Sequence, residues 1–551
     1  MVDADERADG LLKWWGDLKA QRNSFDDLWQ TITDLVFPDG PDFTGRSAQQ
    51  GERRTERQYD STVTLALFKF AAVMESLLTP RLSKWHRVTS TNPELNKVQR
   101  VKVFWDDAAE KLFRARKDPR ARYYSHNYDT LLSMGAYGNR GMLILPRPTG
   151  GIQYRALPLD GLWVALDAEG VVNTVFRRYE LEAKECVRIW GDKAPERART
   201  AKSPFEKLEF LHVIMPRTDI DYEAPGFRSM PWASIEIAVK DRKIMSEGGY
   251  TTWPLPFGRY VRSPREDYGR GPATMVLPHV GVVNEQKRTH LEAGELIARP
   301  PVLLPADGLI GSKDAGGTID LRSGSLVYGG VDDRGNQLAR PFVNGGNPAI
   351  TREMIQDEQQ IIQDPFLVNL FQILIETPQR TATEVLELVR EKGILIAPTV
   401  GRQHDEWLGP QIEAELDILE AQGKLGEMPP ELIEAQGEYE IVYDSPATHM
   451  MRSEEMLGVQ QMLELAFAMA ERFPSQAPRI EAMISVPDII RLQHEVGGAP
   501  ARVLRGEDEV EAIMAREAQA AQEAQAVEQL PAVAKGMRDL AQAAPALEAV
   551  A

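Results

Sequence analysis

Residue types that could do chemistry are spread along this 551-residue chain instead of being gathered into motifs. The chain has no G-x-x-x-x-G-K-[ST] phosphate-binding loop, no H-E-x-x-H zinc motif, no EF-hand loop, no G-x-S-x-G nucleophile elbow and no protein-kinase motif set. None of its eight histidines lies at metal-ligand spacing from another on an expected helix. We therefore predict no enzyme activity, no cofactor, and no catalytic or metal-binding residues.

Carboxylate pairs and one thiol are the remaining reactive groups. Asp26-Asp27, Asp106-Asp107 and Asp332-Asp333 are adjacent, so on a helix the two side chains of a pair point to different faces. Solvated charge explains these pairs better than general acid–base catalysis. The lone Cys186 excludes a disulfide within one chain and a multi-cysteine metal site. We predict a structural cysteine and a reducing compartment.

Composition limits the class of protein further. The hydrophobic content of 43% and charged content of 26% are ordinary for a soluble protein. A net charge of −18 argues against binding nucleic acid over the whole surface but allows local contact with DNA. The chain has no apolar window long enough to span a membrane, and its acidic start lacks the apolar region of a secretory signal.

The elements that would position any site are organised around residues 268–301. A glycine turn, Tyr268–Pro272, precedes an expected helix at about 278–298, in which Pro278 fits the first turn. Ten glycines then lie between Pro300 and Gly346, and the short strands expected there are 302–304, 318–321 and 325–328. A second helix, at about 349–364, leads back. This pattern predicts a helical stalk that ends in a small tip.

Regions of mixed helix and strand precede the stalk, and helices follow it. We expect helices at 11–37, 60–78 (capped by Asp60-Ser61), 96–116, 127–136 and 182–190, with short β-branched runs after Gly141 and at 208–215 and 234–239 that form an antiparallel sheet. Residues 366–378 are apolar and bounded by prolines, which suggests a loop or short helix outside the core. A capping box at 381–384 begins a long helix to about 422, bent at Pro398 and Gly409-Pro410, and further helices are expected at 456–470, 481–484, 487–495 and 507–551.

Two basic clusters could contact phosphate: Arg53, Arg54 and Arg57 in one, and Lys111, Arg114, Arg116, Lys117, Arg120 and Arg122 in the other. A solvated loop is favoured for the first, and a solvated face or subunit contact for the second. Acidic segments are more extensive. Eleven acids accompany the single base Lys424 from Asp405 to Glu440, and nine acids accompany three bases from Glu507 to Ala551.

The order of several blocks resembles the head-to-tail connecting (portal) proteins of short-tailed, T7-like bacteriophages, from about residue 11 to 525. The blocks are Val36-Phe37-Pro38, Tyr59-Asp60-Ser61-Thr62, Leu78-Thr79-Pro80 with Trp85, Tyr268-Gly269-Arg270-Gly271-Pro272 with Leu277-Pro278 and Asn284, Thr381-Ala382-Thr383-Glu384-Val385, Tyr443-Asp444-Ser445-Pro446, and Leu504-Arg505.

The resemblance implies an α+β, mainly helical, multi-domain protomer that forms a ring. Its expected parts are a wing (1–270), an outgoing stem helix (271–299), a clip (300–346), a returning stem helix (347–365), a channel loop (366–382), a long kinked wing helix (383–440), a crown (441–506) and a C-terminal barrel helix (507–551).

The implied function is a conduit for double-stranded DNA during genome packaging and ejection, in a ring, usually twelve-fold, at one capsid vertex of the virion. Implied partners are the terminase motor, major capsid and scaffolding proteins, and tail adaptor and nozzle proteins, with no membrane. Assembly would take place in the host cytoplasm. Acid-rich surfaces would keep the duplex from sticking, because neutralised phosphates add affinity.

The resemblance also suggests two sets of site residues. The channel loop would present Phe366, Asn369, Phe371, Gln372, Gln379 and Arg380. The stem would pack between subunits through Val280, Val283, Leu291, Met354 and Ile361, and the stripe Val280, Val283 and Leu291 would be exposed in a single chain. Two other functions stay open on the residues alone: a capsid-associated DNA-packaging enzyme subunit, and an acidic helical scaffold or adaptor protein.

Overall fold

The structure, a computed structural model, describes residues 4–45, 51–52, 54–56, 58–305, 322–332, 334–336, 348–368, 396–434, 437–490, 510 and 512–519. The chain divides into two compact units. The first comprises Met1–Trp85, Arg114–Lys424 and Ser445–Leu457, and the second His86–Phe113, Leu425–Asp444 and Gly458–Ala551. The mixture of helix and antiparallel strand confirms the expected α+β class.

Two antiparallel sheets form the centre of the first unit. The five-stranded sheet has the order β4-β5-β6-β7-β8 and the three-stranded sheet the order β3-β2-β9. The sequence missed two of these strands. All of β8 except its first residue is only half-buried, and β9 has three residues, so neither shows a clear alternation of apolar and polar side chains. The strands are β2 (Asn139–Pro146), β3 (Ile152–Leu157), β4 (Leu162–Leu166), β5 (Val172–Glu182), β6 (Lys207–Pro216), β7 (Trp232–Ala238), β8 (Lys243–Tyr250) and β9 (Phe257–Arg259).

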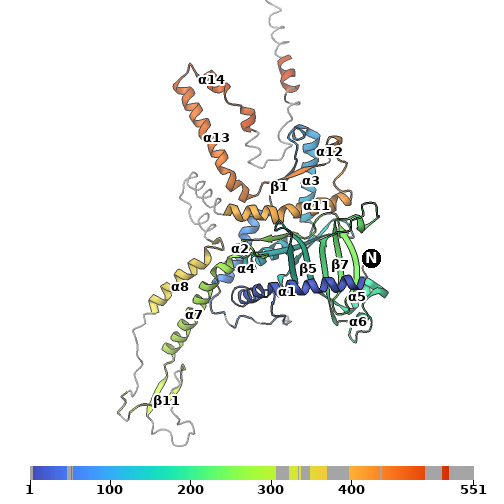
Figure 1. Cartoon of the computed structure of the whole chain (residues 1–551). Helices are drawn as coiled ribbons and strands as arrows, with labels where there is room; N and C mark the ends of the chain where they lie inside the picture. Colours follow the sequence, from blue (N-terminus) through green and yellow to red (C-terminus); the bar gives the residue numbers. More distant parts are fainter. Residues whose placement is uncertain are drawn as a thin grey trace, which may run out of the picture. The chain divides into compact units, whose positions relative to one another are not determined.

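Helix α1 (Ala4–Leu35) runs along the five-stranded sheet (Figure 1). Its buried residues Ala8, Leu11, Trp15 and Leu18 recur every three or four positions and pack on inward side chains of β4 to β7. The ring of Trp15 meets Trp163 edge to face at 5.4 Å. The helix begins seven residues before the predicted start at residue 11.

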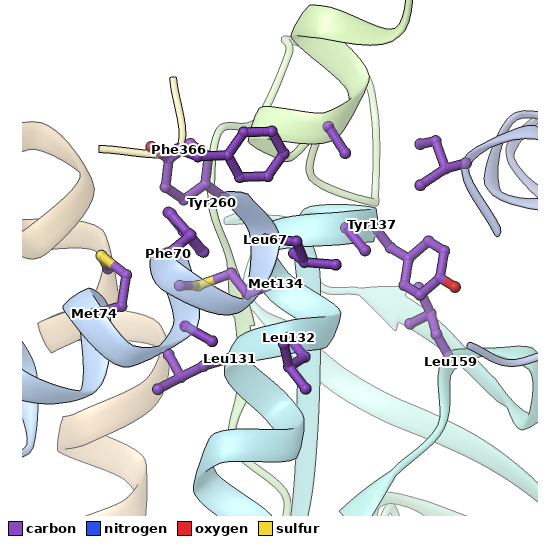
Figure 2. Close-up of a cluster of buried hydrophobic side chains, with 14 of the residues drawn as sticks. Leu67, Phe70, Met74, Leu131, Leu132, Met134, Tyr137, Leu159, Tyr260 and Phe366 are labelled. Carbon is purple, nitrogen blue, oxygen red and sulfur yellow. The ribbon is translucent and has the colours of Figure 1, made fainter. Parts of the chain in front are cut away.

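A second layer of helices forms the main core (Figure 2). Helix α2 (Thr62–Leu78) crosses α4 (Tyr123–Tyr137) so closely that a Cβ on Gly135 would lie 2.6 Å from Leu67 Cδ1. The predicted helix 127–136 starts four residues earlier, after Arg122 in a left-handed conformation with φ of 58°. The expected cap of α2 is confirmed for Asp60, which accepts a hydrogen bond from the Thr62 amide at 2.8 Å, but Ser61 makes no capping bond.

Short helices α5 (Ala183–Trp190) and α6 (Glu196–Arg199) pack at one end of the five-stranded sheet. Cys186 lies there, fully buried beside Phe210, and burial raises its thiol pKa. The prediction of a structural cysteine is therefore confirmed by its packing.

Helix α7 (Pro272–Ala298) and helix α8 (Pro348–Gln363) pack against each other (Figure 1). The ends of both agree with prediction within a residue, except that α7 begins six residues before residue 278 and Pro278 lies inside it. Pro272 occupies the first turn instead, so only the carbonyl of Thr274 loses its helical donor at Pro278. Beyond α7, β10 (Val302–Pro305) and β11 (Leu326–Val331) pair in parallel, and the expected strand 318–321 lies outside the described residues.

The long helix before residue 422 is described from residue 396. It contains a π-helical segment, η6 (His404–Leu408), directly before α11 (Gly409–Ala421). The sequence predicted bends at Pro398 and at Gly409-Pro410. The helix continues through Pro398, and the π segment lies directly before Gly409, where Pro410 removes one helical donor. The bend itself stays a prediction. The capping box at 381–384 lies outside the described residues.

The second unit contains a two-stranded antiparallel sheet of β1 (His86–Ser90) and β12 (Tyr439–Tyr443), with α12 (Pro430–Glu434). Helix α3 (Gln99–Lys117) begins in this unit and ends in the first. Helix α13 (Pro446–Arg472) starts ten residues before its prediction. The helix predicted at 481–484 begins four residues earlier, since α14 spans Ala477–Ala482 with Pro478 in its first turn. Residues 486–490, 510 and 512–519 are helical.

Candidate interaction site at helices α7 and α8

The root of α7 is a contact between two backbone turns. Gly271 ends the turn at 268–271 in an extended conformation, and a Cβ there would lie 2.7 Å from both the Gly138 amide nitrogen and the Met134 carbonyl oxygen. Gly138 itself has a φ of 77° and follows α4. The amide side chain of Asn139 links the same turns, donating to the Gly269 carbonyl at 2.9 Å and accepting from the Gly269 amide at 2.7 Å. Glycine is therefore required here for close approach.

Tyr268 fixes this root to the core. Its ring packs against Phe25 and Trp29, and its hydroxyl oxygen accepts a hydrogen bond from the Val164 amide at 3.1 Å. Burial raises the pKa of Tyr268 to about 12, so the phenol is neutral at physiological pH. The aromatic ring thus connects α7 to α1 and to β4.

The segment before α2 holds both helices of the pair. The Tyr59 amide donates to Asn284 Oδ1 on α7 at 2.6 Å. Gln359 on α8 donates to the second oxygen of Asp60 at 2.8 Å. His279 and Glu358 connect α7 directly to α8, with 2.7 Å between Nδ1 and Oε2. Tyr59–Thr62 and Asn284 both belong to the sequence blocks that resemble portal proteins. In the structure, hydrogen bonds from this segment attach α7 and α8 to the start of α2.

The inner half of α7 belongs to the core of its own chain. Ala273, Val276, Val280 and Val283 are all buried there. The prediction that Val280 and Val283 are exposed in a single chain is wrong, because the spacing of these valines faces them inward onto the body. Leu291, the third residue of that predicted stripe, is 49% exposed, as expected.

The outer half of α7 has no buried side chain from Glu285 to Ala298. Helix α8 has two apolar stripes, offset from each other by one residue. Ile355 and Ile362 form the buried stripe, whereas Met354 and Ile361 form the other and are 51% and 44% exposed. The predicted packing residues Leu291, Met354 and Ile361 are thus available on the surface of one chain.

Further exposed apolar residues on α7 were missed. Met275, Val282 and Leu296 are exposed, and together with Thr289 they occupy every seventh position from 275 to 296. A seven-residue search along the helix would have found this stripe, because positions seven apart lie on nearly the same face.

The predicted channel-loop residues are only partly described. Phe366 is fully buried and packs edge to face on Phe70, with ring centroids 6.1 Å apart (Figure 2). The expectation that the segment lies outside the core is wrong for Phe366, which follows α8 directly and fills the core between α2 and Tyr260. Asn369, Phe371, Gln372, Gln379 and Arg380 lie outside the described residues.

The larger basic cluster is not one solvated face. Arg116 is buried, and its guanidinium donates to both oxygens of Glu415 at 3.0 and 3.1 Å between Nε and the carboxylate. Burial would lower the pKa of Arg116, but attraction and hydrogen bonds from Glu415 outweigh it and raise the pKa. Arg114, Lys117, Arg120 and Arg122 are exposed. Lys111 pairs with Asp107 and donates to the Leu425 carbonyl.

Several of the other residues considered as candidates for chemistry make hydrogen bonds or ion pairs within the chain. Arg54 donates to the Gly40 carbonyl at 3.1 Å, while Arg53 and Arg57 lie outside the described residues. Asp26 pairs with Arg22, and Asp332 accepts hydrogen bonds from the turn that follows it. Among the described residues, no group of three or more His, Cys, Asp or Glu side chains could hold a metal ion. Nor is any described helix long and apolar enough to cross a membrane.

Comparison with known proteins gives consistent results. A family model described as "Bacteriophage head to tail connecting protein" matches residues 8–504. A probable portal protein of Bordetella phage BPP-1 is 27% identical over 414 residues, covering 73% of each chain. The portal protein of Salmonella phage epsilon15 is 22% identical over 554 residues, covering 98% of this chain and 96% of its own.

Proposed function

The chain belongs to the family of bacteriophage head to tail connecting proteins, and from this premise we propose that its copies form a closed ring, usually twelve-fold, at one capsid vertex. A portal function in the virion, in association with capsid and tail proteins, accords with the family and with both relatives. The family is structural and not enzymatic. The ring would conduct double-stranded DNA during packaging and ejection, after assembly in the host cytoplasm.

One observation supports the ring most directly: the α7–α8 pair is fixed at its root to the rest of the chain and exposes several large apolar side chains. Met275, Val282, Leu291, Met354 and Ile361 are exposed in one chain although each is a large apolar residue. Met275 and Val282 are seven residues apart on one face of α7, and Met354 and Ile361 are seven apart on α8, whereas Leu291 lies on the opposite side of α7. Exposed apolar side chains of this kind are typical of surfaces that pack on another copy. The proposal therefore assigns these residues to contacts between neighbouring subunits.

We assign the other parts of the protomer the boundaries that the sequence predicted. Residues 1–270 and 383–440 would form the wing, 271–299 and 347–365 the stem, 300–346 the clip, 366–382 the channel loop, 441–506 the crown and 507–551 the barrel helix. The clip would bind the terminase motor and later the tail adaptor and nozzle proteins, while the wing would contact major capsid and scaffolding proteins.

The charge of the chain suits a conduit. A net charge of −18 disfavours tight binding of a polyanion, because each neutralised phosphate would add affinity and retard movement. Between residues 405 and 440, Glu406 and Glu415 are bonded to arginines within the chain and Asp417 to Thr252, so the exposed acids among the others would form the repelling surface. Arg380 would supply a weak contact in the channel loop.

Light scattering after size exclusion, together with negative-stain electron microscopy, tests the ring. We expect a species near twelve times 61.7 kDa and ring-shaped particles. A monomer that stays stable at high concentration, without rings, would overturn the proposal.

A matched pair of variants locates the interface. Ile361→Glu places a charge on the proposed subunit contact, whereas Ile189→Glu changes a residue of similar exposure, 50% against 44%, on α5. We expect Ile361→Glu to shift the population to monomer and Ile189→Glu to leave rings intact. The reverse result would place the contact elsewhere.

A further inference from the structure

Five exposed basic side chains of the first unit have no part in the proposed function. We call them the basic patch: Lys117 at the end of α3, Arg120 and Arg122 in the turn before α4, Arg155 on β3, and Lys424 after α11. In the part of the chain that the structure describes, none of the five forms an ion pair, although acids outnumber lysines and arginines by 82 to 64 in the whole sequence. A group of cations without acid partners, on so acidic a chain, is a surface that can bind a negatively charged partner.

Hydrogen bonds of the backbone bring the turn and strand β3 together. The Tyr154 amide donates to the Ala121 carbonyl at 3.3 Å, so the chain at Arg120 and Arg122 runs next to the chain at Arg155. The imidazole of His126 is affected by both sides. Burial lowers the pKa of His126, Asp129 raises it, and the charges of Arg122 and Arg155 lower it further. Arg122 and Arg155 are therefore close enough to act on the same side chain.

The turn between β2 and β3 connects the other end of the patch. Arg147 donates from Nη2 to Asp118 Oδ2 at 2.8 Å, and Asp118 lies between Lys117 and Arg120 in the sequence. The side chain of Gln422 accepts from the Gly151 amide at 2.7 Å and donates to the Gly151 carbonyl at 3.0 Å.

These bonds hold Lys424 beside the same turn, with its Nζ atom 3.3 Å from the position of a Cβ on Gly150. The patch is thus positioned by bonds that do not use its own charged groups, and its five side chains stay available to a partner.

The composition of the surface distinguishes between kinds of partner. No large apolar side chain is exposed between residues 104 and 170, where four of the five basic residues lie. Protein interfaces have an apolar and aromatic centre, and surfaces that bind single-stranded nucleic acid present aromatic rings for stacking. Tyr123 and Tyr154, the aromatic residues next to the patch, are both buried. A polar, positively charged surface without exposed rings is typical of contact with a duplex.

We propose that the basic patch binds the phosphate backbone of double-stranded DNA without reading its base sequence. Each of the three guanidinium groups can donate two hydrogen bonds to a phosphate, and the two lysines add point charges. The choice of DNA as the polyanion rests on the proposed function, whereas the choice of a duplex backbone rests on the surface itself. Binding through about five phosphates is weakened roughly a hundredfold or more between about 50 and 200 mM salt, so the contact is local and reversible.

Fluorescence anisotropy of a labelled duplex of arbitrary sequence, titrated with the full-length protein, tests the proposal. In the double variant Arg120→Gln/Arg155→Gln, two phosphate contacts are lost. We expect its affinity at about 100 mM salt to fall by about tenfold or more, and its dependence on salt to become shallower. Loss of binding to a polyglutamate peptide of equal total charge, without binding of the duplex, would assign the patch to an acidic protein and overturn the proposal.

The matched control is Arg188→Gln/Arg197→Gln, which makes the same change in net charge on α5 and α6. Each of these arginines is paired with an acid, Glu185 at 2.7 Å and Asp241 at 3.3 Å. We expect this variant to keep the affinity of the unchanged protein. Equal affinities of the two double variants, or no binding by the unchanged protein, would refute the basic patch as a DNA contact.

Negative-stain images of the same samples separate this inference from the proposed ring. Intact rings with undiminished affinity in Arg120→Gln/Arg155→Gln refute the basic patch alone. Binding by a monomer that falls in the same variant supports the basic patch and refutes the ring.

Discussion

The two halves of α7 form one continuous helix but are stabilised in different ways. From Pro272 to Asn284 the helix has a root of backbone contacts and several buried side chains. From Glu285 to Ala298 it has no buried side chain, only exposed pairs such as Arg288 with Glu292 at 3.0 Å and the Ser323 hydroxyl on the carbonyls of Glu295 and Arg299. Isolated helices of this length are marginal. The difference teaches that contacts within one chain hold only the inner half of α7, and the proposed ring would supply the missing contacts of the outer half.

Among single substitutions, the largest effect should come from the root of α7. Gly271→Val places a branched side chain where even a Cβ would lie 2.7 Å from backbone atoms of Gly138 and Met134. We expect the free energy of unfolding to fall by roughly 3 kcal/mol or more, since backbone atoms cannot move aside easily. Urea unfolding of the isolated chain measures the change.

Gly281→Ala is its control, because nothing lies within 4 Å of a Cβ at Gly281 in the same helix. We expect this variant to be neutral or more stable by up to about 1 kcal/mol. Equal losses in both variants would mean that the root contact does not decide the stability of α7.

Acidification offers a second way to loosen the body. His212 is buried against Ser234, and burial lowers its pKa from 6.5 to about 3. Below pH 6.5 the unfolded chain binds a proton that the folded chain does not. The free energy of unfolding therefore does not depend on His212 above pH 6.5. As the pH falls from 6.5 to 3, protonation of the unfolded chain lowers it by up to roughly 4 kcal/mol. Thermal unfolding from pH 7 to pH 4 should show the loss, and His212→Gln should reduce its slope.

Valine and leucine truncations compare the two halves directly. Val283→Ala removes buried atoms from the core and should lower the free energy of unfolding by roughly 1–2 kcal/mol. Any loss of rings in this variant should follow from the loss of folded chain. Leu296→Ala, in the outer half, should change the unfolding of a single chain by less than about 0.5 kcal/mol but weaken assembly. Paired urea unfolding and sedimentation measurements separate these effects. A large loss of chain stability from Leu296→Ala would contradict the comparison.

The smallest expected effect concerns the exposed ion pair. Arg288→Ala removes the contact with Glu292 and should lower the stability of the chain only slightly, an effect that high salt would erase. Hydrogen exchange along α7 reports it locally. We expect faster exchange in residues 285–298 of the monomer and little change in the ring, where neighbours would protect the backbone.

Much of the secondary structure could be predicted from local pattern. The last residue of α7, both ends of α8, the helices of the first half and most antiparallel strands follow from apolar periodicity, prolines and glycines. Strand β8 could not be predicted, because its residues are almost all half-buried, and the start of α7 was misplaced because Pro278 is tolerated within it.

The candidate site was predictable to a lesser degree. Leu291, Met354 and Ile361 are exposed as a contact surface requires, whereas Val280, Val283 and Phe366 are in the core. An apolar stripe shows that a helix face will be covered, but the sequence alone does not show whether the cover comes from the same chain or from a second copy.

By itself, the sequence determined the class of fold, the family, the two-helix arrangement after Tyr268 and the lack of any recognisable catalytic motif. Those properties depend on residues close together in the chain. Only the tertiary structure decided that Gly271 meets Gly138, that Asp60 and Tyr59 hold α8 and α7, and that Arg116 pairs with Glu415 while Arg140 donates to Gln403. These contacts join residues that are far apart in the sequence, and a buried charge or a glycine acquires its role from the partner that the fold places beside it.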